Sequence, residues 1–201
     1  QKVVCIDGCF LRCHSRILEN MIGSSKLLVF DALSHYKRYN DIFDIDGVLT
    51  NGMVMIMPDG DQLRQMNIKD GYAIKTAVDN GYNVCIISGG SNEGVRLRLK
   101  GLGVTDIFLG VHNKVEQLNL YLNKNNIDIK SALYMGDDIP DLQVMQLVGL
   151  PCCPQDAAIE IKAASLYISH KNGGKGAVRD VIEQVMKVQD KWNDNFDAKY
   201  D

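Results

Sequence analysis

Four features that would assign this chain to a function class are missing from its sequence. The 201 residues have a formal net charge of −3 and no basic stripe, so nucleic-acid binding is not predicted. No apolar run approaches the roughly 20 residues that a membrane-spanning helix needs. Residues 1–10 lack the charged-then-apolar order of a secretory signal. A zinc site is not predicted for the group Cys5, Cys9, Cys13 and His14, because none of the six cysteines forms a Cys-x-x-Cys pair.

The cysteines that are present indicate a reducing environment. Cys152 and Cys153 are adjacent, and adjacent cysteines rarely form a disulfide with each other. Cys85 lies in an apolar run, where a free cysteine behaves as a small buried hydrophobe. We therefore expect a cytoplasmic protein. Hydrophobic residues make up 46% of the chain and charged residues 23%, which is typical of a soluble globular protein able to bury a sizeable core.

The chain divides into three parts. Residues 1–38 show little pattern beyond a strand-like run at 26–31 and an Ile6-Asp7-Gly8 without a carboxylate two residues earlier. We interpret them either as an N-terminal extension or as sequence that precedes the natural start. Residues 39–190 are interpreted as one domain and residues 191–201 as a tail. Asn40 and Asp41 make the start of the domain a poor candidate for a buried strand.

Within the domain, predicted strands alternate with predicted helices. The strands are expected at 42–44, 82–87, 106–109, 132–135, 148–152 and 166–168. The helices are expected to begin at Asp70, Ser91 or Asn92, Asn113, Asp138, Asp156 and Ala177. Extended runs at 53–57 and 62–68 flank Pro58-Asp59-Gly60 and predict a β-hairpin. This order is typical of a parallel sheet covered on both faces, in which ligands bind at the carboxyl ends of the strands.

Residues 43–50 contain two carboxylates, Asp44 and Asp46, directly before Gly47. If Asp44 ends a strand, Asp46 lies on the following turn, and both carboxylates converge at the sheet edge. Converging carboxylates repel each other unless a cation or a shared proton lies between them. The pair therefore fits a hard divalent ion and leaves one carboxylate free to attack a substrate. Taken alone, the motif could equally be an ordinary Asp-Gly turn.

Polar groups follow three further predicted strands. Ser88-Gly89-Gly90 places a hydroxyl before two glycines, which allow backbone N–H groups to approach a phosphate. Lys114 opens a helix, where it can neutralise a phosphoryl oxygen or a carboxylate. Gly136-Asp137-Asp138, with Asp141 one helical turn on, is an acidic cluster that favours metal binding over capping. Singly, the first two are also explained by a common loop and a solvated surface lysine.

Together these four elements resemble the haloacid dehalogenase superfamily of phosphatases. Residues 42–192 further resemble its 3-deoxy-D-manno-octulosonate 8-phosphate phosphatases, through the stretches 52–71, 95–103 and 173–179. The resemblance implies an α/β fold, with a Rossmann-like parallel sheet, helices on both faces and a β-hairpin flap after the first strand. No stretch is long enough for a large cap domain, as in the capless branch of the superfamily.

The resemblance also implies the activity and its residues. The expected enzyme is a magnesium-dependent phosphatase that hydrolyses 3-deoxy-D-manno-octulosonate 8-phosphate through an aspartyl-phosphate on Asp44, with Asp46 as acid and base. Ser88 and Lys114 would stabilise the phosphoryl charge. The implied Mg²⁺ site comprises Asp44, the backbone carbonyl of Asp46, and Asp137, supported by Asp138 or Asp141. The candidates for binding the phosphorylated keto sugar acid are Thr50, Arg64, Lys69, Gly89, Arg96 and Arg179.

Three alternatives remain open at this point. The substrate could be a nine-carbon ketodeoxy sugar acid 9-phosphate, the acceptor could be a sugar rather than water, or the domain could be a non-catalytic oligomerisation module. The intact Asp44 and Asp46 argue against the last. Many relatives carry arginine directly after Ser-Gly, where this chain has Gly90, so that contact is missing here or comes from another basic residue.

The sequence also predicts self-association. Five apolar residues in succession at 53–57 make both faces of one hairpin strand hydrophobic, and a two-stranded ribbon cannot bury both. Cover by residues 1–40 is the alternative. We expect a homo-oligomer, by resemblance a homotetramer, in which Arg64 or the tail near Trp192 reaches a neighbour's site.

Overall fold

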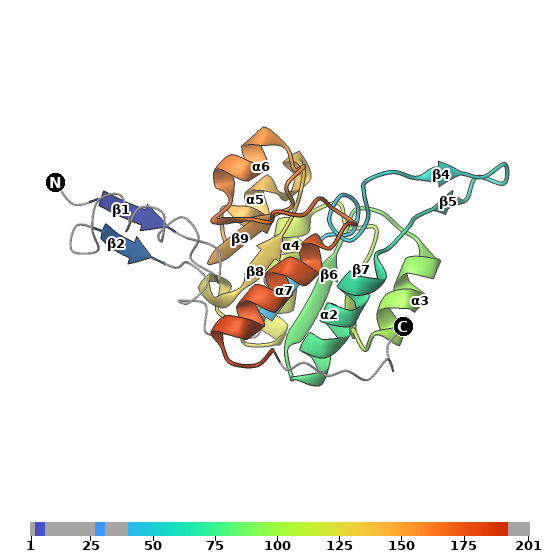
Figure 1. Ribbon diagram of the computed structural model, residues 1–201. Coiled ribbons are helices and arrows are strands. Elements are labelled where there is room, and N and C mark those ends of the chain that lie inside the picture. Colours follow the sequence, from blue (N-terminus) through green and yellow to red (C-terminus); the bar gives the residue numbers. More distant parts are fainter. Residues whose placement is uncertain (1–2, 7–26, 31–39, 193–201) are drawn as a thin grey trace.

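The computed structural model describes residues 3–6, 27–30 and 40–192 (Figure 1). Its central feature is a parallel sheet with the strand order β10-β9-β8-β3-β6-β7. The strands are β3 (Asn40–Phe43), β6 (Asn83–Ile87), β7 (Asp106–Phe108), β8 (Leu133–Met135), β9 (Leu150–Cys153) and β10 (Tyr167–Ile168). Each predicted strand is present, and the predicted parallel α/β fold is confirmed.

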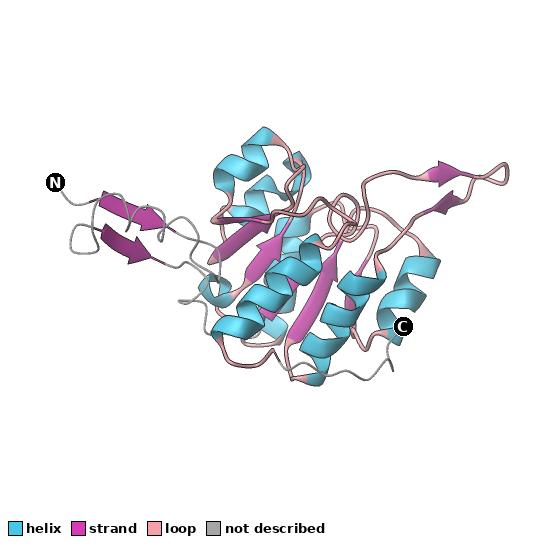
Figure 2. Cartoon of the chain, viewed as in Figure 1, coloured by secondary structure: helices cyan, strands magenta, loops and turns pink. Residues whose placement is uncertain are grey.

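Helices cover both faces of this sheet (Figure 2). One face carries α2 (Ile68–Asp79), α3 (Glu93–Gly101) and α7 (Ala177–Val188). The other carries α4 (Lys114–Lys124), α5 (Leu142–Met145) and α6 (Ile159–Ala164), with the 3-10 turns η3 (Ile129–Ser131) and η4 (Ile139–Asp141) beside them. Alternate strand residues point to opposite faces, so Phe43 and Ile86 join one core cluster while Ile42 and Cys85 join the other.

The starts of α3, α4 and α7 follow the prediction, whereas those of α2 and α6 differ. The predicted start of α6 at Asp156 is wrong, because this helix begins at Ile159 after Ala158. The side chains of Asn92 and Asn113 accept backbone N–H groups at the starts of α3 and α4, as expected. The predicted start of α2 at Asp70 is wrong, because Asn67 caps that helix three residues earlier. Asp70 instead caps α7, since its carboxylate accepts the N–H groups of Arg179 at 2.7 Å and Gly176 at 3.3 Å. Burial raises the pKa of Asp70 to about 6.

The predicted hairpin is present but shorter than expected. Its strands are β4 (Met55–Ile56) and β5 (Gln62–Leu63), which pair antiparallel. Residues 64–67 have no regular structure, so the predicted strand to residue 68 is wrong in its second half. The hairpin projects away from the sheet, and no other labelled element lies beside its tip (Figure 1).

The strand β3 occupies the middle of the sheet despite its polar start. Asn40 and Asp41 are both buried, and neither carboxylate oxygen of Asp41 has a hydrogen-bond partner among the described residues. Burial raises the pKa of Asp41 to about 7. Pairing with β6 on one side and β8 on the other holds this segment in place, so tertiary context overrides local strand preference.

The remaining described residues form a separate small sheet. The strands β1 (Val3–Ile6) and β2 (Leu27–Phe30) pair parallel, and β2 lies within the run predicted as a strand. The Asp7-Gly8 pair, Cys9, Cys13 and His14 lie outside the described residues, as does the tail after Trp192. Within the described ranges, no helix has the length and apolar character needed to cross a membrane.

Candidate active site

The polar groups predicted at the strand ends meet at one edge of the sheet. Asp44 directly follows β3, Ser88 directly follows β6, Asp137 follows β8, and Lys114 begins α4 beyond β7. Because β6 and β8 flank β3, their carboxyl ends bring these side chains to Asp44. A cavity of about 300 Å³ opens here, lined by Asp44, Asp46, Gly47, Gly52, Ser88, Gly89, Gly90, Lys114, Asp137, Asp138, Pro140 and Asp141.

Lys114 is held between two carboxylates. Its Nζ lies 2.7 Å from Asp44 Oδ2 and 2.7 Å from Asp141 Oδ1, and all three side chains are buried. Burial by itself would lower the pKa of Lys114, but the charges of Asp44 and Asp141 outweigh it and raise the pKa. The lysine is therefore charged at any physiological pH, and the solvated surface position that a lone lysine usually takes is excluded here.

Asp141 accepts hydrogen bonds from several groups that line or support the site. Besides Lys114, its Oδ1 accepts the Tyr134 hydroxyl at 2.6 Å, and its Oδ2 accepts the backbone N–H of Asp137 at 3.1 Å. These contacts occupy both carboxylate oxygens, so they suit a supporting role better than direct metal binding. Tyr134 is fully buried in β8 and was not predicted; an apolar strand containing one tyrosine gives no indication that its hydroxyl reaches the site.

Three carboxylates lie close together here, and Lys114 is the one cation that the described residues place between them. Oxygens of Asp44, Asp137 and Asp141 all lie within 4.8 Å of one another. Burial and then the charge of Asp141 raise the pKa of Asp44, while Lys114 and the Ser88 hydroxyl oppose this. Burial and then the charges of Asp141 and Asp44 raise the pKa of Asp137 to about 7. A divalent cation among these carboxylates would offset their mutual repulsion and favour their ionised form, which is the form that binds Mg²⁺, so the residues present fit this ion.

Gly47 allows the two parts of the acidic cluster to meet. It has a φ of +78°, and a Cβ added to it would lie 1.8 Å from Asp137 Oδ2. Any other residue would both strain this turn and push the Asp137 carboxylate away from Asp44. Gly47 is thus needed for two reasons. It forms the turn that the sequence predicted, and it leaves room for the Asp137 carboxylate.

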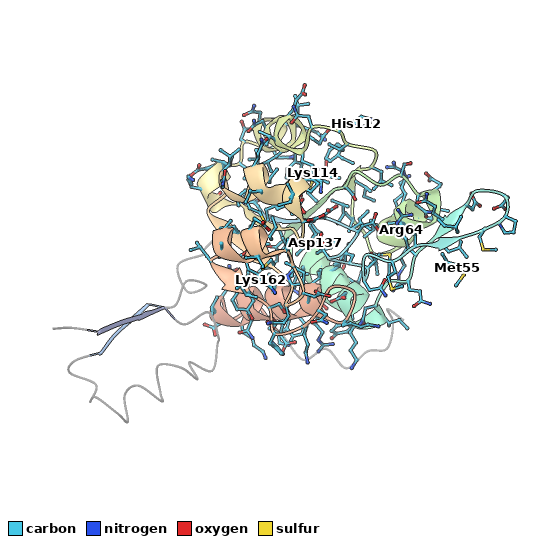
Figure 3. All side chains as sticks on the ribbon, turned by 90° about the horizontal axis from the view of Figure 1, so that it is seen from above. Met55, Arg64, His112, Lys114, Asp137 and Lys162 are labelled. Carbon is cyan, nitrogen blue, oxygen red and sulfur yellow. The ribbon has the colours of Figure 1, made fainter. Side chains whose placement is uncertain are left out.

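Asp46 is bound by an arginine from the hairpin. Arg64 donates from Nε to Asp46 Oδ1 at 2.7 Å and from Nη2 to Oδ2 at 3.1 Å. In Figure 3, Arg64 lies near the base of the hairpin and Met55 farther out along it, while Lys114 and Asp137 lie in the body of the domain, away from the hairpin tip. Arg64 therefore contacts the site of its own chain, rather than the neighbour's site expected for it or for the tail near Trp192.

The other candidates for sugar binding lie around the cavity or away from it. Gly89 lines it, whereas Thr50 is fully buried and its hydroxyl contacts Ile45 and Asp46 within the loop. Arg96 donates to Glu93 and to the carbonyl of Ile107 on the flank of the domain.

Lys69 and Arg179 are not brought to the acidic cluster either. Lys69 lines a separate cavity of about 310 Å³ with Gly174 and Lys175. The Arg179 guanidinium lies over the rings of Tyr72 and Trp192, at 5.5 and 5.6 Å, and it also pairs with Glu183.

Comparisons with known proteins agree with this geometry. A family model described as haloacid dehalogenase-like hydrolase matches residues 101–182. The 3-deoxy-D-manno-octulosonate 8-phosphate phosphatase KdsC of Salmonella typhi is 35% identical over 150 residues, which cover 75% of this chain and 80% of that protein. The chain belongs to this family of haloacid dehalogenase-like hydrolases.

Solved structures of the phosphatase family share the fold. A probable YrbI family phosphatase from Pseudomonas syringae superposes with a TM-score of 0.77 at 33% identity, covering 80% of this chain and 92% of its own. The 3-deoxy-D-manno-octulosonate 8-phosphate phosphatase of Moraxella catarrhalis, in complex with a magnesium ion, a phosphate ion and a KDO molecule, gives 0.76 at 30% identity, with 79% and 91% covered. The predicted capless α/β fold is confirmed for this member of the family.

Proposed function

We propose that this protein is a magnesium-dependent phosphatase that hydrolyses 3-deoxy-D-manno-octulosonate 8-phosphate. The observation that carries the proposal is the buried Lys114 between Asp44 and Asp141, with Asp46 and Asp137 on the same cavity. This arrangement pairs a nucleophile with an acid/base and with charges for a phosphoryl group. A family relative forms a complex with magnesium, phosphate and KDO, which supports both the ion and the sugar acid.

In the first half-reaction the Asp44 carboxylate attacks phosphorus and forms an aspartyl-phosphate. The bond between phosphorus and the sugar oxygen breaks, and the leaving alkoxide takes a proton from the Asp46 carboxyl. Lys114 and the Ser88 hydroxyl, which already surround Asp44, stabilise the charge on the phosphoryl oxygens.

In the second half-reaction Asp46 acts as a base. It takes a proton from the water that attacks the phosphorus of the aspartyl-phosphate, and the bond to Asp44 breaks. Inorganic phosphate leaves and both aspartates return to their starting states. When bound, Mg²⁺ neutralises phosphoryl charge and is held by Asp44, the backbone carbonyl of Asp46, and Asp137. Asp141, and Asp138 beside it, support these ligands.

The enzyme works as a homotetramer in the cytoplasm. The exposed apolar side chains of the hairpin support association, since a capless site gains its missing walls from neighbouring subunits. The buried thiols Cys85, Cys152 and Cys153 are unpaired, which agrees with a reducing compartment.

Phosphate release from a panel of sugar-acid phosphates tests the proposal. The eight-carbon acid 8-phosphate should be hydrolysed with the highest kcat/KM, ahead of nine-carbon acid 9-phosphates and neutral sugar phosphates. Asp44→Asn serves as the control and should release no phosphate above background. A higher kcat/KM for a nine-carbon acid, or equal release by Asp44→Asn, would contradict the proposed substrate or the proposed nucleophile, respectively.

A further inference from the structure

Arg64 and Asp46 form a two-point contact that links the hairpin to the chemistry. Two hydrogen bonds, at 2.7 and 3.1 Å, bind one carboxylate oxygen each, as in a bidentate arginine–carboxylate pair. The Arg64 side chain is only 7% exposed, whereas that of Asp46 is 34% exposed. The Thr50 hydroxyl also donates to Asp46 Oδ1, but at a longer 3.4 Å and to one oxygen alone, so the arginine supplies the shorter, two-point hold on this partly exposed carboxylate.

Gly90 provides the space for this contact. A Cβ at position 90 would lie 2.8 Å from Asp46 Oδ2 and 3.2 Å from Arg64 Nη2. The first distance is below that of real contacts, so any side chain here would displace the carboxylate, the guanidinium or both. The loop after β6 and the hairpin base are also joined directly, because Asn92 Nδ2 donates to the carbonyl of Gln62 at 3.0 Å.

We propose that Arg64 is the positioning residue for Asp46. The absence of a side chain at Gly90 leaves the space in which the Arg64 guanidinium and the Asp46 carboxylate meet. The inference rests on the proposed function, because it concerns the acid and base of that reaction. The guanidinium enters the space that a side chain on residue 90 would occupy, so the hairpin supplies a group that the Ser88-Gly89-Gly90 loop lacks. A substitution at the base of the hairpin would therefore slow the proton transfers by Asp46 without removing any group that contacts the phosphoryl group.

The alternative role for Arg64 is a direct contact with the substrate's carboxylate, and the two roles differ in what they demand. A substrate contact would matter for sugar-acid phosphates alone and would appear mainly in KM. A positioning residue would matter for every phosphate monoester, because Asp46 acts on all of them, and it would appear mainly in kcat. Misplacing a reacting group by about 1 Å can cost on the order of a hundredfold in rate.

The test compares Arg64→Ala with wild type on two substrates, the sugar-acid phosphate and p-nitrophenyl phosphate, which has no carboxylate. We expect kcat to fall by at least about tenfold on both, with KM changed by less than about threefold. Guanidinium ion at a non-denaturing concentration should restore part of the rate to Arg64→Ala but none to Asp46→Asn, with sodium chloride at equal ionic strength as the control. Arg64→Lys should remain slow, because an ammonium group cannot bind both oxygens.

Gly90→Ala tests the second half of the pair. It should lower kcat on both esters, whereas Gly101→Ala, whose added Cβ meets nothing within 4 Å, should leave kcat unchanged. Thermal unfolding of each variant separates a local effect from misfolding. Loss of sugar-acid phosphate turnover alone, with p-nitrophenyl phosphate turnover intact in Arg64→Ala, would overturn the inference while leaving the proposed function standing.

Discussion

Asp46 stands apart from the other carboxylates of the site. Asp44, Asp137 and Asp141 lie close together around Lys114, whereas Asp46 is held by Arg64 on the side of the hairpin. This separation suits the two tasks, since a nucleophile needs a fixed, charge-balanced position and an acid/base must face the leaving oxygen. The roles of Asp44 and Asp46 can therefore be separated by mutation.

Asp46→Asn should leave part of the first half-reaction and block the second. The Asn side chain cannot donate a proton to the leaving oxygen or take one from water, so kcat should fall by roughly 10²–10⁴. Aspartyl-phosphate should still form and accumulate, which rapid quenching with a phosphorus-labelled substrate would show as label on the protein. Asp44→Asn is the control, and equal label on both variants would contradict the assignment.

The acidic cluster predicts an absolute need for a divalent ion. Chelation with EDTA should remove activity and Mg²⁺ should restore it, because Asp44 and Asp137 offer hard oxygen ligands. Asp137→Asn should raise the Mg²⁺ concentration needed for half-maximal rate by at least about tenfold. Full activity of exhaustively chelated protein, or an unchanged Mg²⁺ dependence in Asp137→Asn, would show that the cluster does not bind the ion.

At the scale of the elements, β3 leads into the proposed nucleophile at its carboxyl end and buries a carboxyl group, that of Asp41, near its start. Its last residue leads directly to Asp44, while Asp41 lies in the middle of the sheet beside Val84 and Leu133 in register. In the unfolded chain this carboxyl ionises near pH 3.8, but in the fold it holds its proton up to about pH 7. Its ionisation therefore opposes folding, and stability is lost as the pH rises from about 4 to 7.

Replacing Asp41 with valine should stabilise the protein, and more so at alkaline pH. The raised pKa corresponds to about 4 kcal/mol of lost stability above pH 7 and less at pH 5, where the native carboxyl is still neutral. The melting temperature should rise by roughly 5–10 °C more at pH 8 than at pH 5. Asp41→Asn is the matched control, because it removes the charge but keeps a polar group. Equal gains for Asp41→Val at both pH values would contradict the account.

At the scale of the whole molecule, the hairpin is the part that the single chain leaves uncovered. Met53 is 72% exposed and Ile56 63%, with Val54, Met55 and Leu63 also exposed. Both faces of the first hairpin strand are therefore apolar and open, as the sequence predicted. Of residues 1–40, proposed as an alternative cover, 1–2, 7–26 and 31–39 lie outside the described part of the chain.

Val54→Asp combined with Ile56→Asp should disrupt the assembly. Charges on both faces of the hairpin strand oppose its burial between subunits, so light scattering should show smaller species. Activity should fall as well, because the open sheet edge loses its neighbouring walls. Leu120→Asp, an exposed apolar position on α4, is the control and should leave the assembly unchanged. A wild-type protein that is a fully active monomer at low concentration would refute the proposed tetramer.

The sequence by itself determined those features of the protein that depend on residues close together in the chain. The alternation of apolar runs with capped helices predicted the parallel sheet, because strand and helix periodicities are local. The spacing of Asp44 and Asp46, with polar groups after three more strands, predicted the site, because all carboxyl ends of a parallel sheet share one edge.

Only the tertiary structure decided which groups pair across elements. The bond from Arg64 to Asp46 spans 18 residues, and it depends on an irregular stretch after β5 that no periodicity predicts. The cap that Asp70 provides for α7 spans 109 residues, and Asp41 is buried only because two strands enclose it. Such contacts follow from how the elements pack, since a side chain's partner is set by distance in space, which short sequence patterns do not encode.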